Sequence, residues 1–291
     1  MSLDSMADIL HCMEQEGKEF WEVVLAADME ERQVSRESSL AKMLTTWQAM
    51  VDASDSYTGD RRSVSGLVGG DGLKMRQYAI RGKAMSGGYV SEVIAEALSM
   101  AESNACMRRI VAAPTAGACG VLPAVLLPLC KYEELNQRQI LEALYVASGI
   151  GAVIAYRACI AGAAGGCQAE IGSASAMAAG ALASLRGGDC KQIGHAAAMA
   201  LKNLMGLVCD PVAGLVEVPC VKRNVVGAVN AVSCADMALA GIESRIPVDE
   251  VIDCMGEVGT RMPMELRETA LGGLAATPTG KAIKERMEQE N

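Results

Sequence analysis

Apolar residues recur every three to four positions along most of this 291-residue chain, a spacing that places them on one face of an α helix. Over residues 4–54 the spacing predicts two amphipathic helices. The first is marked by Ile9, Met13 and the run 20–25, and the second by Leu40, Met43, Leu44, Trp47 and Val51. No segment alternates cleanly at a period of two, so we expect few strands.

Later apolar repeats predict helices over residues 90–109, 136–161, 169–185, 189–207, 225–242 and 248–258. Asn136 is placed as an N-cap, and Gln139 three residues later completes a capping box. Polar or glycine-rich breaks fall at 55–72, 112–120 and 162–166. We therefore expect a mostly α fold, a compact bundle of alanine- and glycine-rich helices with glycine-rich active-site loops. Its N-terminal helical segment is residues 1–57 and its core is residues 58–291, in a single catalytic domain.

Composition supports helices over a β-sandwich. Apolar residues make up 51% of the chain but aromatic residues only 3%, and β-sandwich cores are rich in aromatic and β-branched side chains. The net charge is −9 with no basic stripe, which argues against nucleic acid as a partner. The longest nearly apolar run, 144–156, is too short to span a bilayer. No signal peptide is visible, so a cytoplasmic protein without a membrane segment is expected.

Eleven cysteines are present, an odd count without any Cys-x-x-Cys pair. This pattern argues against a disulfide framework and against a structural zinc site. Most of the cysteines lie inside apolar helical patterns, where we interpret them as small buried hydrophobic residues: Cys12, Cys106, Cys130, Cys159, Cys190, Cys234 and Cys254.

Three other cysteines stand at breaks in the apolar pattern, beside glycine or proline. They are Cys167 in Gly-Gly-Cys-Gln-Ala-Glu, Cys209 in Val-Cys-Asp-Pro-Val-Ala-Gly, and Cys220 in Val-Pro-Cys-Val-Lys-Arg-Asn. Three thiolates can hold an iron–sulfur cluster and leave one iron as an open Lewis acid, an arrangement suited to a non-redox enzyme. Their spacings, 42 and 11 residues, match no ferredoxin pattern. Three buried thiols beside tight turns remain the alternative.

Other polar residues are candidates for binding a carboxylate. Lys74 follows Gly-Gly-Asp-Gly-Leu, and Lys222 and Arg223 follow Cys220; each could instead be a solvated surface charge. Thr115 and Gly117 lie in a loop before a helix, whose free N–H groups could hold an anion or simply form a cap. A smaller set has weaker claims: Asn104 as a substrate ligand, His195 as a base, and Asp210 and Glu170 as acids beside the cysteines.

From about residue 60 to 281 the chain resembles the α subunit of the iron–sulfur-dependent L-serine dehydratases. The resemblance rests on these segments: Gly-Gly-Asp-Gly-Leu-Lys at 69–74, Ala-Ala-Pro-Thr-Ala-Gly at 112–117, Gly-Gly-Cys-Gln-Ala-Glu-Ile-Gly-Ser-Ala at 165–174, the long segment 206–224, the segment that begins at Arg267, and Thr-Pro-Thr-Gly at 277–280.

The resemblance implies a [4Fe–4S] cluster on Cys167, Cys209 and Cys220, with the fourth iron facing L-serine. The implied reaction yields pyruvate and ammonia. We predict catalytic roles for Lys74 and Lys222, and substrate binding by Asn104, Thr115 and Gly117. A pyridoxal phosphate mechanism is disfavoured, because no Ser-x-Lys-x-Arg/Asn run is present.

Some features depart from single-chain members of the family, which have an additional N-terminal β domain with a Ser-Ser-His-Thr segment. That segment does not occur here, so the chain resembles the separate α subunit. We expect a β subunit as partner, and a homo-oligomer is a further option. Some members also end in a cysteine that reaches the fourth iron, whereas the last cysteine here is Cys254. Cys119 stands where relatives often carry serine.

Three alternatives to an L-serine dehydratase remain. They are a lyase acting on L-cysteine or another β-substituted amino acid, a non-catalytic iron–sulfur sensor or scaffold subunit, and a helical protein without metal.

Overall fold

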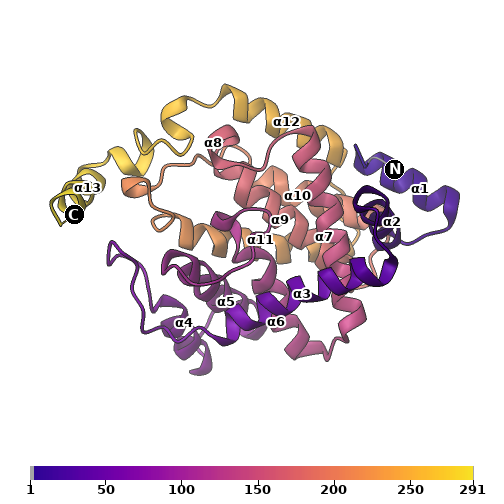
Figure 1. Cartoon of the computed structure of the whole chain (residues 1–291), viewed down its shortest axis with the longest axis horizontal. Coiled ribbons are helices and arrows are strands. Elements are labelled where there is room, and N and C mark those ends of the chain that lie inside the picture. The colour runs from indigo at the N-terminus through magenta and orange to yellow at the C-terminus, as the bar shows by residue number, and fades with distance from the viewer. Residues whose placement is uncertain (1–2, 291) are drawn as a thin grey trace.

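The computed structural model describes residues 3–290, and within them it contains thirteen α helices and no strand (Figure 1). The α helices are α1 Met6–Glu16, α2 Phe20–Arg32, α3 Arg36–Asp55, α4 Asp71–Ile80, α5 Gly87–Ala105, α6 Val121–Glu133, α7 Gln137–Arg157, α8 Gly162–Gly165, α9 Ser173–Leu185, α10 Cys190–Asn203, α11 Cys220–Leu239, α12 Val248–Arg261 and α13 Pro278–Glu290. The predicted mostly α fold is confirmed.

Helix α9 forms the centre of the bundle, with α7, α10 and α11 packed around it (Figure 1). Its residues 173–183 are all buried. Small side chains let the neighbouring helices approach closely, and Gly180 is the tightest point: a Cβ there would lie 2.1 Å from Ile150 Cδ1 on α7. The alanine and glycine content read from the sequence therefore sets the helix spacing in the core.

The N-terminal segment contains three helices rather than the two predicted. Gly17 has a left-handed backbone conformation and ends α1, and Gln33 does the same for α2. Ser35 then caps α3 through its side chain. The apolar spacing continues across these breaks, so the prediction from periodicity joined α1 and α2 into one helix. Helix α2 packs on α7.

Several other boundaries differ from the prediction. Helix α4 begins at Asp71, within the last two residues of the predicted loop 55–72, and neither α4 nor α13 was predicted. Helix α11 begins at Cys220 rather than near residue 225, and α7 ends at Arg157 rather than near 161. The predicted capping box of α7 is confirmed, since Asn136 Oδ1 accepts from Gln139 N at 3.1 Å and Gln139 Oε1 accepts from Asn136 N at 3.0 Å.

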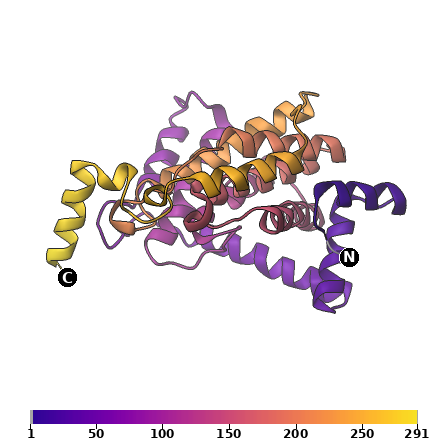
Figure 2. The ribbon, with the colours of Figure 1, turned by 90° about the horizontal axis from the view of Figure 1, so that it is seen from above.

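Helix α7 has 21 residues and is, by length and composition, apolar enough to cross a membrane. Two thirds of its most apolar window, however, is buried inside the bundle, as is usual for a core helix. The N-terminal helices and α13 lie at opposite ends of the long axis (Figure 2).

Candidate metal centre

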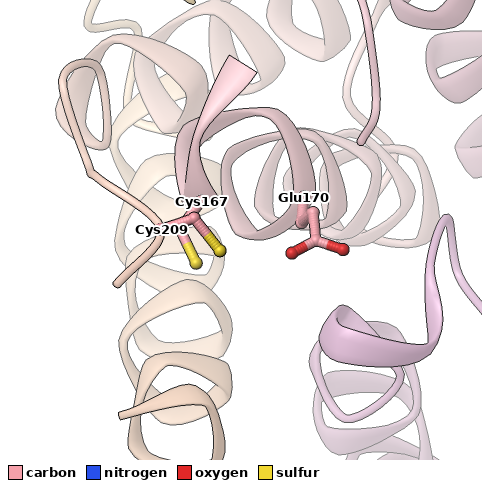
Figure 3. A group of neighbouring side chains, drawn as sticks. All are labelled: Cys167, Glu170 and Cys209. Atoms are coloured by element: carbon pink, nitrogen blue, oxygen red, sulfur yellow. The ribbon is translucent and has the colours of Figure 1, made fainter. Parts of the chain in front are cut away.

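Two of the predicted cysteines meet in the structure. The sulfurs of Cys167 and Cys209 and a carboxylate oxygen of Glu170 all lie within 4.8 Å of one another (Figure 3). Both cysteines are buried and Glu170 is half-buried. The two thiols lie side by side, 42 residues apart in sequence, so the fold has assembled a group that could bind a metal ion.

Local backbone features bring these side chains together. Cys167 follows Gly166, whose φ of +78° suits glycine, and it precedes a π-helical turn, Gln168–Gly172, that carries Glu170. Such turns often occur at functional sites. Cys209 lies in an extended segment, where its N–H donates to Leu266 O at 2.8 Å and its carbonyl accepts from Glu268 N at 2.7 Å.

Gly162 has no side chain and so leaves space beside the Cys167–Glu170–Cys209 group. A Cβ at this position would lie 2.8 Å from Glu170 Oε2 and 3.1 Å from Cys209 Sγ. A side chain here would therefore clash with both Glu170 and Cys209. The glycine-rich break predicted at 162–166 thus keeps space for these two side chains.

Arg223 lies against the same group and is mostly buried. Its guanidinium donates to Cys167 Sγ at 3.4 Å, to Val208 O at 2.8 Å and to Asp210 Oδ1 at 2.7 Å. The Cys209 thiol and the Arg223 charge lower the pKa of Cys167, against the effect of burial. The pKa of Cys209 is raised, first by its contact with Cys167 and then by burial. Cys167 is thus the more easily deprotonated thiol of the pair.

Cys220, the third predicted ligand, is buried at the first residue of α11 but is not part of the Cys167–Glu170–Cys209 group. Burial raises the pKa of its thiol to about 12, and the charge of Cys167 contributes to this shift. Hydrogen bonds place Cys220 near the group: Asn224 Nδ2 donates both to Cys220 O and to Gly117 O, and Gly117 lies against Glu170.

The loop predicted to bind substrate lies on the other side of Glu170. A Cβ on Gly117 would be 3.3 Å from both carboxylate oxygens of Glu170. The Thr115 hydroxyl opposes the rise that burial causes in the pKa of Glu170. Yet this hydroxyl is buried and makes no hydrogen bond of normal geometry within residues 3–290. A buried polar group without a partner calls for an explanation, and a ligand is one.

Two asparagines hold this loop in place. Asn104 Nδ2 donates to Ala116 O at 3.1 Å. Asn224 Nδ2 donates to Gly117 O at 2.8 Å and to Cys220 O at 3.0 Å, while its Oδ1 accepts from Gly120 N at 2.9 Å. Asn224 was missed by the sequence analysis, although its place at the end of the long 206–224 segment was a signal.

Lys74 and Lys222 are brought together on one carboxylate. Each Nζ lies 2.9 Å from an oxygen of Asp71, at the start of α4. Lys222 and then Lys74 lower the pKa of Asp71. Both lysine side chains are more than half exposed, so neither belongs to the buried Cys–Glu group.

His195 and Cys119 also lie outside that group. His195 Nδ1 accepts a hydrogen bond from Ser244 N at 3.3 Å, a contact that fixes the loop after α11. Cys119 is completely buried and burial raises the pKa of its thiol to about 12. Such a thiol is unreactive and acts as a small hydrophobic residue.

The donor set fits a soft, thiophilic metal. Paired sulfurs favour zinc, copper(I) or an iron–sulfur cluster over magnesium or calcium. The arginine hydrogen bond to sulfur and the buried setting are the kinds of surroundings that tune such centres.

Comparison with known proteins gives one consistent result. The family model for the serine dehydratase alpha chain matches residues 15–275. The chain is 47% identical to the probable L-serine dehydratase, alpha chain, of Bacillus subtilis (strain 168) over 91% of this chain and 89% of that protein. Identity to the L-serine dehydratase, alpha chain, of Peptoniphilus asaccharolyticus is 41%, over 97% of both chains.

A second type of relative is longer. The chain is 48% identical to L-serine dehydratase 2 of Escherichia coli (strain K12), over 62% of this chain and 40% of that protein. The similarity to separate alpha chains thus extends over nearly their whole length, whereas the similarity to this longer protein covers only part of it.

Proposed function

Because the chain belongs to the serine dehydratase alpha-chain family, we propose that it is the catalytic α subunit of an L-serine ammonia-lyase. The reaction removes the Cα proton and the β-hydroxyl of L-serine, and the resulting aminoacrylate tautomerises and hydrolyses to pyruvate and ammonia. The observation that carries the proposal is the buried pair of thiols beside Glu170 and the 115–117 loop.

The cofactor of this proposal is a [4Fe–4S] cluster held by Cys167, Cys209 and Cys220. The adjacent sulfurs of the first two residues support this ligand set, as does the position of Cys220, which Asn224 connects to the loop beside Glu170. When bound, such a cluster supplies an iron with an open position, a Lewis acid for the leaving hydroxyl oxygen. Arg223 keeps a positive charge beside Cys167 and so favours thiolate over thiol at this ligand.

In this proposal the substrate lies beside Glu170 and the loop. The Thr115 hydroxyl makes no hydrogen bond of normal geometry within residues 3–290 and can donate to the substrate. Gly117, which lacks a side chain, lies against the Glu170 carboxylate, and Asn104 and Asn224 keep the loop in position. Lys222 and Lys74 attract and hold the substrate carboxylate, and Asp71 orients both ammonium groups.

A separate β subunit is the expected partner, because the relatives that match along nearly their whole length are named alpha chains. We place the protein in the cytoplasm, where a reducing environment protects eleven free cysteines.

The decisive experiment is anaerobic reconstitution with iron and sulfide, followed by iron and sulfide analysis and a pyruvate assay with L-serine, with and without a β subunit. We expect pyruvate together with a cluster that each of Cys167→Ser, Cys209→Ser and Cys220→Ser abolishes. Cys130→Ser, a change on α6, is the control and should retain the cluster.

Other outcomes would redirect the proposal. Turnover of L-cysteine but not L-serine would point to a lyase for another β-substituted amino acid. A cluster without any lyase activity, even with the β subunit, would indicate a sensor or scaffold subunit. If the reconstituted protein bound no iron, the proposed cluster would be wrong.

A further inference from the structure

A cavity of about 350 Å³ opens between α4, α5 and α6, which lie together at the lower edge of Figure 1. Its size is within the range of small-molecule sites, roughly 300–1,000 Å³. None of its lining residues belongs to the Cys–Glu group or to the 115–117 loop. The polar residues of the lining are Arg76, Ser91, Glu92, Glu96, Lys131 and Tyr132.

Glu96 is the buried acid of this cavity, with only 4% of its surface exposed. Its Oε2 pairs with Arg76 Nη2 at 2.7 Å. Its Oε1 is buried and accepts no hydrogen bond from any residue in 3–290. A buried carboxylate oxygen without a donor is costly, and a ligand that carries N–H groups would satisfy it.

Positive charge lies nearer the mouth. Arg76 is 38% exposed and reaches inward to Glu96. Lys131 is exposed on α6 and, within the described residues, forms no ion pair. Glu92 accepts from Tyr132 at 3.4 Å across the opening. The cavity thus has a buried acceptor inside, and two cations with the Glu92 carboxylate nearer the mouth. The inner acceptor suits an ammonium group, and Arg76 and Lys131 suit a carboxylate on the same molecule.

We propose that this cavity binds a small α-amino acid, whose ammonium donates to Glu96 Oε1 and whose carboxylate faces Arg76 and Lys131. The site is separate from the Cys–Glu group. Its Arg76 is on the same helix, α4, as Asp71, the partner of Lys222.

The test uses the full-length chain and L-alanine, which lacks the hydroxyl that the proposed reaction removes. Equilibrium dialysis with radiolabelled L-alanine should give saturable binding in which one equivalent depends on Glu96. Glu96→Gln and the cavity-filling Ala79→Leu should each weaken it at least about tenfold. Ala79 is only partly buried on α4, so its replacement avoids disturbing the core.

The control is Glu142→Gln, which also removes a carboxylate paired with arginine but lies on α7. It should bind L-alanine as the unchanged protein does. Ethylamine should compete weakly with L-alanine, and acetate should not compete. Lys131→Gln should weaken the binding of L-alanine several-fold without changing the binding of ethylamine. The proposal is overturned if L-alanine does not bind when it is present at 10-fold molar excess over millimolar protein. It is also overturned if Ala79→Leu and Glu96→Gln both bind L-alanine with unchanged affinity, or if ethylamine binds as tightly as L-alanine.

Discussion

Arg223 joins the two sides of the candidate metal centre. Its guanidinium contacts the Cys167 sulfur on one side and the Asp210 carboxylate on the other. Asp210 Oδ2 in turn accepts from Leu274 N at 2.8 Å. This chain of contacts connects the cysteine loop to the 264–277 segment, so one buried cation fixes both a ligand and the loop that covers it.

Replacement of Arg223 should therefore be costly. Arg223→Met leaves Asp210, which is 5% exposed, as a buried charge without its partner, and breaking such a pair typically costs about 3–5 kcal/mol. Arg138→Met is the matched control, because Arg138 is 80% exposed and forms an i,i+4 pair with Glu142, worth about 0.3–0.5 kcal/mol. Urea unfolding of the unchanged protein and of the two variants measures the free energy of unfolding of each. If Arg223→Met and Arg138→Met lost the same amount, burial of the Arg223–Asp210 pair would not matter for stability.

Lys222 provides a test of substrate binding. If its ammonium holds the substrate carboxylate, Lys222→Met should raise the KM for L-serine at least about tenfold, a loss of about 1.4 kcal/mol of binding, and Lys222→Arg should recover part of it. Lys74→Met should have a smaller effect, because Lys74 is the more exposed of the two partners of Asp71. Steady-state kinetics on the reconstituted enzyme measure both, and an unchanged KM for Lys222→Met would show that the lysine is only a surface charge.

At the scale of elements, the helices with strong local signals could be predicted from the sequence. The capping box of Asn136 and Gln139 fixes the start of α7 by local hydrogen bonds alone. The glycine break at 162–166 likewise marks the end of one apolar pattern. Cys167 and Cys209 were singled out because they stand beside such breaks, and the structure brings them together.

The features that were not predicted depend on contacts between distant segments. Helix α4 begins where Glu102 of α5 accepts from Asp71 N at 2.8 Å, so its cap comes from another helix. Helix α13 is held in part by Arg286, whose guanidinium donates to Ser65 O at 3.0 Å. The role of Asn224 depends on a loop more than 100 residues away. Local periodicity contains no information on these contacts.

Two glycines test how tightly the helices pack near the site. A Cβ on Gly120 would lie 2.8 Å from the carbonyl oxygen of Ala97 on α5 and 2.9 Å from Asn224 Oδ1. Gly120→Ala should therefore destabilise the fold by about 1–3 kcal/mol, although its backbone conformation suits alanine.

Gly194→Ala is the matched control. The only atom near its Cβ is Val248 Cγ1, at 4.0 Å, and alanine is the better helix former by about 0.5–1 kcal/mol. Gly194→Ala should thus be neutral or stabilising in chemical unfolding. If Gly120→Ala were equally harmless, the contact between α5 and the start of α6 would be looser than the structure indicates.

For the whole molecule, the proposed cluster would connect three segments that are separate in the sequence. Cys167 lies beside a π-helical turn, Cys209 in an extended segment that contacts residues 266–268, and Cys220 at the start of α11. The segment between Cys209 and Cys220 contains no helix longer than one turn. A shared metal cluster would cross-link these regions and add its binding free energy to that of folding.

Loading the cluster under anaerobic conditions should therefore raise the Tm of the chain by several degrees, since about 1 kcal/mol corresponds to roughly 2–4 °C for a protein of this size. It should also protect the 210–219 segment from proteolysis, because that segment lies between two of the proposed ligands. Differential scanning calorimetry and limited proteolysis, each with and without the cluster, measure these effects. The triple variant Cys167→Ser, Cys209→Ser, Cys220→Ser should show neither. A loaded protein that melts and is cleaved like the cluster-free chain would mean that the three cysteines do not hold one common centre.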